Sequence, residues 1–315
     1  MKTLHWKEKL NNLGKNGTPC FFIIDYKGTN AHIFPLSEIP EGIQFSFLET
    51  NQTTPEPISI EKYPVAYEKF KKSFDSVFSY LENGEVELVN LTFQTEISPV
   101  SLKEVYEKAK AKYKIIYNDE WVCFSPEIFV KIEENQIKTY PMKGTISASL
   151  PNAASILLNN QKEIDEHHKV VNLLSDDLKK VATEVHTTKF RYIDVIEKST
   201  GNLLQTSSEI VGNLPENWQS HLGDIFSDLL PGGSISGAPK EKTLSIIEQA
   251  ETYDRGFYTG IAGIFDGNSV DSCVLIRFIE QINQKFYYKS GAGITAKSNP
   301  QDEYNEIIEK IYIPN

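Results

Sequence analysis

The chain has 315 residues, with 32 Lys and Arg against 43 Asp and Glu, and a formal net charge of −11. Its 40% hydrophobic and 24% charged residues exclude a disordered or fibrous protein, and the acidic excess argues against nucleic acid or an anionic membrane as the main partner. The length is enough for two domains or for one large two-layer unit.

The predicted elements begin with a buried strand at residues 20–26. Residues 48–64 are rich in Thr and Pro and form the best candidate boundary. Helical spacing over Tyr67–Leu81 ends at Asn83-Gly84, a typical helix C-cap. The next predicted elements are a strand at Val86–Ile97, a helix at Leu102–Ala111 and strands at 121–125, 128–132 and 137–144, with a turn at Asn135.

The second half begins with a long polar helix predicted at Ala154–Thr183. It is followed by strands at Tyr192–Lys198 and Leu203–Val211, a helix at Leu222–Leu230, a Gly/Pro-rich loop at 231–240, a helix at Lys242–Glu251, strands at Tyr258–Asp266, Ser272–Ile282 and Lys285–Ser290, a glycine turn at Ser290–Gly293 and a helix from Asp302. Because the strands cluster in blocks and rarely alternate with single helices, we expect an α+β fold with antiparallel sheets.

The three cysteines, Cys20, Cys123 and Cys273, lie far apart and show no CxxC spacing, which disfavours a disulfide framework or a zinc site. The apolar run at residues 20–24 is too short to span a bilayer, and the N-terminus lacks the apolar centre of a signal peptide. We therefore expect a cytoplasmic protein with neither a membrane nor a nucleic acid as partner.

Two pairs of glutamates stand at helical spacing. Glu163 and Glu166 form one pair, and Glu303 and Glu306 form the other, so each pair presents two carboxylates on one helix face. If the two helices face each other, these oxygens suit Mg²⁺, and without a cation they would raise one another's pKa values. The alternative is two solvated faces of an acidic protein.

Two glycine-rich segments are candidate anion sites. The decapeptide PGGSISGAPK at residues 231–240 opens a helix, where unpaired N–H groups favour an anion, although it could equally be a structural turn. The second, Gly291-Ala292-Gly293, would form an anion-binding turn of free N–H groups. Arg277 stands among apolar neighbours in VLIRF and needs a charged partner, either a bound carboxylate or a structural ion pair.

Three further side chains could carry chemistry. Lys143, between Pro-Met and Gly-Thr, becomes a nucleophile if a pocket desolvates it, although a solvated lysine is the more common case. Glu127 could lie on a neighbouring strand as a general acid. Tyr258 could donate a hydroxyl hydrogen bond or simply fill the core. The adjacent His167 and His168 are expected to be solvent-exposed, not metal ligands.

Taken together these motifs resemble the chorismate-binding enzymes, which include anthranilate, aminodeoxychorismate, isochorismate and salicylate synthases. The resemblance runs from Asn90 to Lys310 through the blocks SPE (125–127), PMKGT (141–145), KEIDEHHKVVNLLSDDL (162–178), PGGSISGAPK (231–240), ETYDRGFYTGIAGIF (251–265), IRF (276–278), GAGITA (291–296) and EYNEIIEK (303–310). It implies two packed antiparallel sheets flanked by helices. Residues 1–315 would form one unit, with 1–75 a shortened N-terminal part and 76–315 the catalytic core.

The resemblance also implies roles for individual residues. Glu163, Glu166, Glu303 and Glu306 would bind Mg²⁺, which holds the ring carboxylate of chorismate. Substrate binding would fall to Thr145, Gln205, Tyr258, Arg277, Gly291, Ala292, Gly293 and Lys310. Glu127 would be the acid/base at the C4 hydroxyl, and Lys143 the catalytic nucleophile.

Lys143 decides the branch that the resemblance implies. Anthranilate, isochorismate and salicylate synthases typically carry Ala at this position, whereas aminodeoxychorismate synthases carry the Lys that attacks C2 of chorismate. The lysine with which isochorismate-type enzymes activate water aligns with Leu88, which cannot act as a base. The expected product is 4-amino-4-deoxychorismate, for p-aminobenzoate and folate synthesis, with ammonia from a separate glutamine amidotransferase subunit.

Departures from the family pattern keep alternatives open. Gln205 replaces an active-site His, Asn172 and Ser175 replace the usual Asp and Arg of their helix, and Ser147 stands where Arg is common. Gln can hydrogen-bond a substrate hydroxyl but cannot transfer a proton near pH 7. The alternatives are an anthranilate or isochorismate/salicylate synthase, or a catalytically inactive chorismate-binding subunit.

Overall fold

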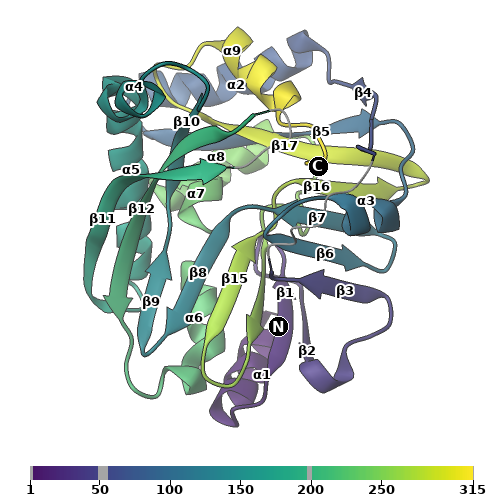
Figure 1. Ribbon diagram of the computed structural model, residues 1–315, viewed down its shortest axis with the longest axis vertical. Helices are drawn as coiled ribbons and strands as arrows, with labels where there is room; N and C mark the ends of the chain where they lie inside the picture. The colour runs from purple at the N-terminus through teal and green to yellow at the C-terminus, as the bar shows by residue number, and fades with distance from the viewer. Residues whose placement is uncertain (1–2, 49–55, 197–200, 315) are drawn as a thin grey trace.

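The computed structural model describes residues 3–48, 56–196 and 201–314, which form two antiparallel sheets with helices on their outer faces (Figure 1). The first sheet has the spatial order β10 (Met142–Ser147), β12 (Leu203–Asn213), β9 (Gln136–Thr139), β8 (Ile128–Glu133), β15 (Val270–Val274), β14 (Ile261–Phe265), β1 (Cys20–Ile24) and β2 (Ala31–Pro35), with β11 (Thr183–Ile196) pairing β12. The second has the order β13 (Gly237–Ala238), β5 (Leu88–Ile97), β17 (Lys285–Ile294), β16 (Phe278–Ile282), β7 (Trp121–Ser125), β6 (Tyr113–Tyr117) and β3 (Ile43–Ser46), with β4 (Lys62–Tyr63) pairing β5. The predicted α+β class with two antiparallel sheets is confirmed.

The central core lies between the two sheets, and β1 shows how the sequence builds it. All five residues of this strand are buried, because side chains alternate between two covered faces. Phe21 and Ile23 pack between the sheets against residues such as Trp121, while Phe22 and Ile24 pack on the other side. Because both faces of this strand are covered, all of its residues are apolar, and the sequence shows a continuous apolar run at residues 20–24.

Helices cover the outer face of each sheet. On the first sheet they are α1 (Thr3–Lys15), α5 (Gln161–Leu178) and α6 (Leu222–Leu229). On the second they are α2 (Tyr67–Glu82), α8 (Lys240–Ala250) and α9 (Pro300–Glu309). The remaining helices are α3 (Leu102–Lys108), α4 (Ala153–Asn159) and the short α7 (Gly233–Ser236). No helix within the described residues is long and apolar enough to cross a membrane.

Two of the predicted helices are confirmed closely. α2 ends with Asn83 as its C-cap and Gly84 at φ +67°, a left-handed conformation that glycine adopts without strain. α6 matches the helix predicted at Leu222–Leu230. Of the predicted boundary at 48–64, residues 49–55 lie outside the described residues, as do residues 197–198 at the end of a predicted strand.

Several predicted elements were wrong in extent, among them the strand at 137–144, which is β9 and β10, and the strand that begins at Tyr192, which is part of the longer β11. The long helix at Ala154–Thr183 is two helices, because Asn160 ends α4 and its side chain caps α5 by accepting from the N–H of Glu163. The strand at Ser272–Ile282 is β15 and β16, which belong to different sheets. The glycine turn at Ser290–Gly293 is the end of β17, paired with β5 as far as Ile294.

A buried ion pair ties α8 to the loop before β14. The side chains of Arg255 and Glu251 are 2% and 3% exposed, and Nη2 of Arg255 lies 2.6 Å from Oε1 of Glu251. We expect Glu251→Ala to lower the free energy of unfolding by about 3 kcal/mol, because it leaves a buried charge without its partner. Asp75→Ala, which breaks an exposed pair, should leave the stability unchanged within error. Urea unfolding measures both, and equal effects would contradict the prediction.

Candidate active site

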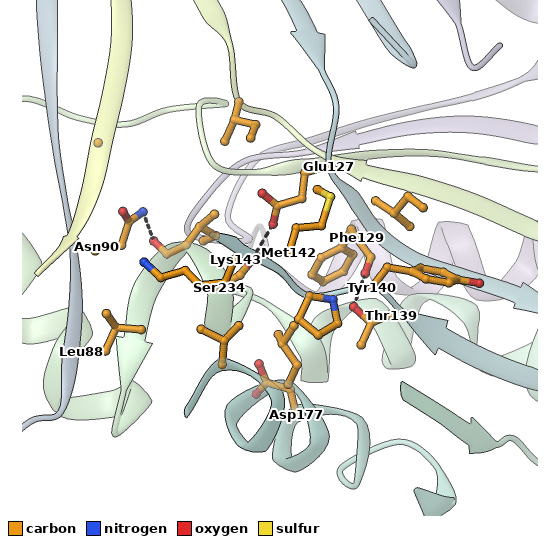
Figure 2. A pocket seen from close by; sticks show the side chains of 18 of the residues that line it. Leu88, Asn90, Glu127, Phe129, Thr139, Tyr140, Met142, Lys143, Asp177 and Ser234 are labelled. Atoms are coloured by element: carbon orange, nitrogen blue, oxygen red, sulfur yellow. Dashed lines mark hydrogen bonds between the residues drawn. The ribbon is translucent and has the colours of Figure 1, made fainter. Parts of the chain in front are cut away.

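A cavity of about 240 Å³ lies between the two sheets. Its walls come from β8, β9 and β10 of the first sheet, from β5 and β17 of the second, and from α5 and α7 (Figure 2). The predicted site residues that line it are Glu127, Lys143, Glu166, Tyr258, Arg277, Gly291, Gly293 and Lys310. Residues that are up to 183 positions apart in sequence, from Glu127 to Lys310, therefore share one space.

Glu127 and Arg277 enter the cavity where the chain passes from one sheet to the other. Glu127 stands between β7 and β8, and Arg277 stands between β15 and β16. The two crossings are hydrogen-bonded to each other, since the N–H of Phe124 donates to Arg277 O (3.0 Å) and that of Val274 donates to Glu127 O (3.1 Å). This double crossing is the physical reason why the strand predicted at Ser272–Ile282 is broken.

Arg277 is a partly buried cation at the cavity wall. It adopts φ +54°, its Nη1 donates to Lys310 O at 2.8 Å, and its guanidinium lies 4.8 Å from the ring centre of Tyr312. Among the described residues no carboxylate lies within ion-pair distance of it. The described residues therefore contain no structural ion pair for Arg277. Its Nη2 donates to Tyr312 Oη at 3.5 Å, and the guanidinium N–H groups that remain suit an anionic ligand.

Glu127 has the environment of a proton donor. Its Oε1 accepts a hydrogen bond from Ser234 Oγ at 3.0 Å. Burial raises the pKa of the Glu127 carboxyl, against the lowering effects of Ser234, Lys310 and Arg277. A carboxyl with a raised pKa stays protonated to higher pH, which is what general-acid chemistry requires.

Lys143 lies at a bulge in β10. Its Nζ is 2.9 Å from Oε2 of Glu166, and its pKa is raised because burial, which lowers it, is outweighed by Glu166 and by the more distant Glu306 and Glu163. The next residue, Gly144, has φ +80°, and a Cβ there would lie 2.7 Å from Oε2 of Glu163. Glycine therefore lets the lysine and the glutamates approach closely.

Of the four glutamates predicted to bind Mg²⁺, Glu166 lines the cavity, whereas Glu163 on α5 and Glu303 and Glu306 on α9 are not among its lining residues. Oε2 of Glu163 is buried without a hydrogen-bond partner, which is a costly state for a carboxylate. Burial raises the pKa of Glu303, and Glu306 raises it further. As they stand, no three acidic, His or Cys side chains in the described ranges converge into a metal site.

The edge of β17 supplies backbone groups to the cavity. β16 pairs β17 only as far as Lys289, so from Ser290 onward this edge has no neighbouring strand in the described part of the chain. Lys310 Nζ donates to Gly291 O at 2.9 Å, and the N–H of a strand residue points to the same side as its carbonyl. The N–H groups of Gly291 and Gly293 therefore face the cavity edge, although they lie in a strand and not in a turn.

Three predicted substrate-binding residues do not line the cavity. Thr145 is exposed, and it lies directly opposite Gln205 in the pairing of β10 with β12. Ala292 is buried in the core beneath α2 and α9, because alternate residues of β17 point to opposite faces.

His167 is buried, so the expectation that both histidines are exposed was wrong for this one. Its Nε2 lies 2.6 Å from Ser208 Oγ, and burial lowers its pKa to about 4. His168 is exposed and stacks on Phe190, with ring centres 4.4 Å apart. A histidine at i+4 from Glu163 on the inner face of α5 could have been predicted to be buried from the helical period.

Sequence reasoning missed Ser234 and Asp177, which both line the cavity. Ser234 lies within the decapeptide that the sequence singled out, but its contact with Glu127 spans 107 residues. Asp177 follows Asp176 at the end of α5, and only the helical period separates the buried member of this pair from the exposed one. Neither contact has a local sequence signal.

The chain is similar to one protein family and to several named relatives and solved structures. The family described as chorismate binding enzyme matches residues 39–314. The chain is 50% identical to an uncharacterized PabA-like protein of Haemophilus influenzae, over 98% of this chain and 96% of that protein, and 29% identical to aminodeoxychorismate synthase component 1 of Bacillus subtilis, over 88% and 60% respectively. Among solved structures, a putative 2,3-dihydroxybenzoate-specific isochorismate synthase of Bacillus anthracis superposes with a TM-score of 0.71 at 21% identity, covering 98% of this chain and 86% of that one.

Proposed function

We propose that this chain, which belongs to the chorismate-binding enzyme family, converts chorismate and ammonia to 4-amino-4-deoxychorismate, as component I of an aminodeoxychorismate synthase. The observation that carries the proposal is the position of Lys143. Its amine lines the same cavity as Glu127 and Arg277, within reach of one small ligand. Relatives named aminodeoxychorismate synthase component 1 in Bacillus subtilis and Escherichia coli support this branch.

In this proposal the substrate's carboxylates are held by cations and backbone donors. Arg277 supplies two guanidinium N–H groups, and the N–H groups of Gly291 and Gly293 supply donors along the edge of β17. Tyr258 is 3% exposed and lines the cavity with no hydrogen bond to its hydroxyl among the described residues, so it has a donor to offer. Such fixed donors bind an anion without reorganisation.

The reaction needs one nucleophile and one acid from the protein. The neutral amine of Lys143 attacks C2, the two conjugated double bonds of the ring shift, and the C4 hydroxyl leaves as water with a proton from Glu127. Ammonia then adds to C4, the double bonds shift back as the lysine leaves from C2, and the new ammonium group returns a proton to Glu127, so that atoms and charge balance. The cavity holds both partners in register, which is where most of the rate gain arises.

Magnesium belongs to the same proposal, with Glu163, Glu166, Glu303 and Glu306 as the residues that would hold it. The orphaned oxygen of Glu163 supports it, since a buried carboxylate oxygen without a donor is stabilised by a nearby cation. Burial raises the pKa of Glu303, and a bound cation would favour its charged form. A bound Mg²⁺ would supply positive charge for the ring carboxylate. With Glu166 engaged in this way, Lys143 would lose the ion-pair partner that keeps its amine protonated.

Leu88 is the observation against isochorismate chemistry. It lines the cavity from β5, at the position that the resemblance assigns to a water-activating lysine. An aliphatic side chain cannot accept a proton, so water would lack a base there. For the inactive-subunit alternative, Gln205 remains the one hint.

Turnover assays separate these functions. The purified protein is incubated with chorismate, Mg²⁺ and an ammonium salt, with aminodeoxychorismate lyase added. We expect p-aminobenzoate to form. Anthranilate or isochorismate as the product would contradict the proposal, and an absence of any product would favour the inactive subunit.

Arg277 should govern affinity. We expect Arg277→Met to weaken chorismate binding by about 10- to 100-fold, because a charged bidentate contact contributes on the order of 1.5–3 kcal/mol. The affinity of Arg277→Lys should fall between those of the wild type and Arg277→Met, since lysine keeps the positive charge but cannot make the bidentate contact of a guanidinium. Isothermal titration calorimetry measures the dissociation constants, with thermal unfolding as a check on folding. An unchanged affinity in Arg277→Met would show that the substrate's carboxylates bind elsewhere.

Ammonia would come from a separate glutamine amidotransferase subunit, and the protein would act in the cytoplasm. Cys20, Cys123 and Cys273 are all free and buried, which supports a reducing compartment. Co-purification with a glutamine amidotransferase, together with glutamine-dependent turnover, would test the partner directly.

A further inference from the structure

One carboxylate holds both ends of the glycine-rich loop at residues 231–240. Asp177 is 5% exposed, and its Oδ2 accepts from the N–H of Gly233 at 3.0 Å. Its Oδ1 lies 2.8 Å from Nζ of Lys240 and 2.7 Å from Nζ of Lys180. Gly233 opens the short α7 and Lys240 opens α8, so the segment between them is tied to a single point on α5.

The residue after Gly233 reaches the proposed general acid. Ser234 Oγ donates to Oε1 of Glu127 at 3.0 Å, from the loop to the crossing between the sheets (Figure 2). Because Oε1 accepts this bond, the carboxyl proton is left on Oε2. In the proposed function, this contact would set which oxygen of Glu127 carries the proton that the reaction uses.

Helix α5 contributes lining residues to the cavity from Glu166 to Leu178. Asp177 comes roughly three turns after Glu166 on α5, which returns it to the same helix face about 16 Å along the axis. Lys169, Val170 and Leu174 line the cavity between them. α5 thus spaces the acidic cluster around Lys143 from the loop that contacts Glu127.

We propose that Asp177 is a positioning residue: by clamping the loop at Gly233 and Lys240, it holds Ser234 in hydrogen-bond contact with the general acid Glu127. The inference rests on the proposed function, because it assigns Glu127 an acid role. Asp177 itself touches neither substrate nor reacting atoms in this scheme. Its effect passes through Ser234.

The expected signature is a shift in the pH profile. The hydrogen bond from Ser234 stabilises the carboxylate form of Glu127 and so lowers its pKa. The positive charges of Lys310 and Arg277 act in the same direction. Removing the Ser234 donor raises the pKa of Glu127, so the alkaline limb of kcat/KM should move to higher pH by ~0.5–1 unit. A general loss of packing would lower activity without moving this limb.

A double-mutant cycle tests the proposal. Ser234→Ala and Asp177→Ala should each lower kcat by about tenfold and move the alkaline limb in the same direction. In the double variant the two effects should not add, because Asp177 acts through Ser234. Additive effects, or an Asp177→Ala variant with an unmoved limb, would overturn the inference.

Controls keep the result interpretable. Asp176→Ala removes the exposed neighbour, which pairs with Lys179, and should leave the pH profile unchanged. If Asp177→Ala does not fold, as judged by thermal unfolding, Lys240→Met replaces it in the cycle, since it frees the other end of the loop. Additivity of Lys240→Met with Ser234→Ala would then overturn the inference.

A second readout separates this inference from the proposed function. Proton uptake on chorismate binding, measured by calorimetry in two buffers of different ionisation heat, needs no turnover. If the wild-type protein makes no 4-amino-4-deoxychorismate but binds chorismate, the proposed function fails. The inference then stands if Ser234→Ala and Asp177→Ala change the uptake equally, and it is overturned if they do not. Absence of binding would overturn both.

Discussion

Lys143→Ala should abolish formation of 4-amino-4-deoxychorismate, with kcat falling by ~10³-fold or more. The amine of Lys143 is the protein group that the proposed reaction uses as a nucleophile, and an alanine cannot form the bond to C2. Substrate affinity should change far less, because Arg277 and the edge of β17 hold the carboxylates. The coupled assay for p-aminobenzoate measures kcat and KM separately.

Two variants distinguish the nucleophile from a mere positive charge. Lys143→Arg keeps the charge beside Glu166, but a guanidinium is not deprotonated in proteins, so it should be as inactive as Lys143→Ala. Lys162→Ala removes an exposed lysine that lies 3.9 Å from the same carboxylate, and it should alter turnover less than about twofold. Substantial activity in Lys143→Arg would refute covalent catalysis.

Glu127→Gln should lower kcat by ~10³-fold, because general-acid groups contribute on the order of 10²–10⁴ and an amide cannot donate the required proton. In the wild-type protein, activity should fall as pH rises through the raised pKa of Glu127, since only the protonated carboxyl can donate. The residual activity of Glu127→Gln should lack this alkaline limb. Rate measurements from pH 5 to 9 give both quantities.

Glu133→Gln is the matched control for this variant. It lies at the exposed end of β8, the strand that begins directly after Glu127, and it does not line the cavity. Its pH profile should match the wild type. If Glu127→Gln retained the same alkaline limb as the wild type, the proton donor would have to be another group.

Much of the site could be predicted because its chemistry-bearing residues stand in short motifs. Lys143, Glu127 and Arg277 were singled out by unusual neighbours and by the family resemblance, and all three line the cavity. The surrounding contacts could not be predicted in this way. The bond between Ser234 and Glu127 joins segments 107 residues apart, and no local pattern encodes it.

The burial of His167 and the split of the strand at Ser272–Ile282 show the same limit. The segment is largely apolar and has no Gly or Pro within it, so its sequence does not reveal that β15 pairs β8 in one sheet while β16 pairs β7 in the other. Arg277 takes φ +54° at that crossing, a conformation that requires support from both sheets.

The sequence shows that the chain carries a net charge of −11, but it does not show where the acidic side chains meet. Periodicity and turn residues determined the elements, since these depend on neighbours within a few positions, and the paired glutamates on α5 and α9 followed from the helical period. The tertiary structure decided which of these faces meet. Packing of distant segments brought Glu166 against Lys143, placed Glu163 and Glu306 near enough to raise its pKa, and left Arg277 without a carboxylate partner in the described residues. Such contacts depend on which distant segments pack together and not on local order.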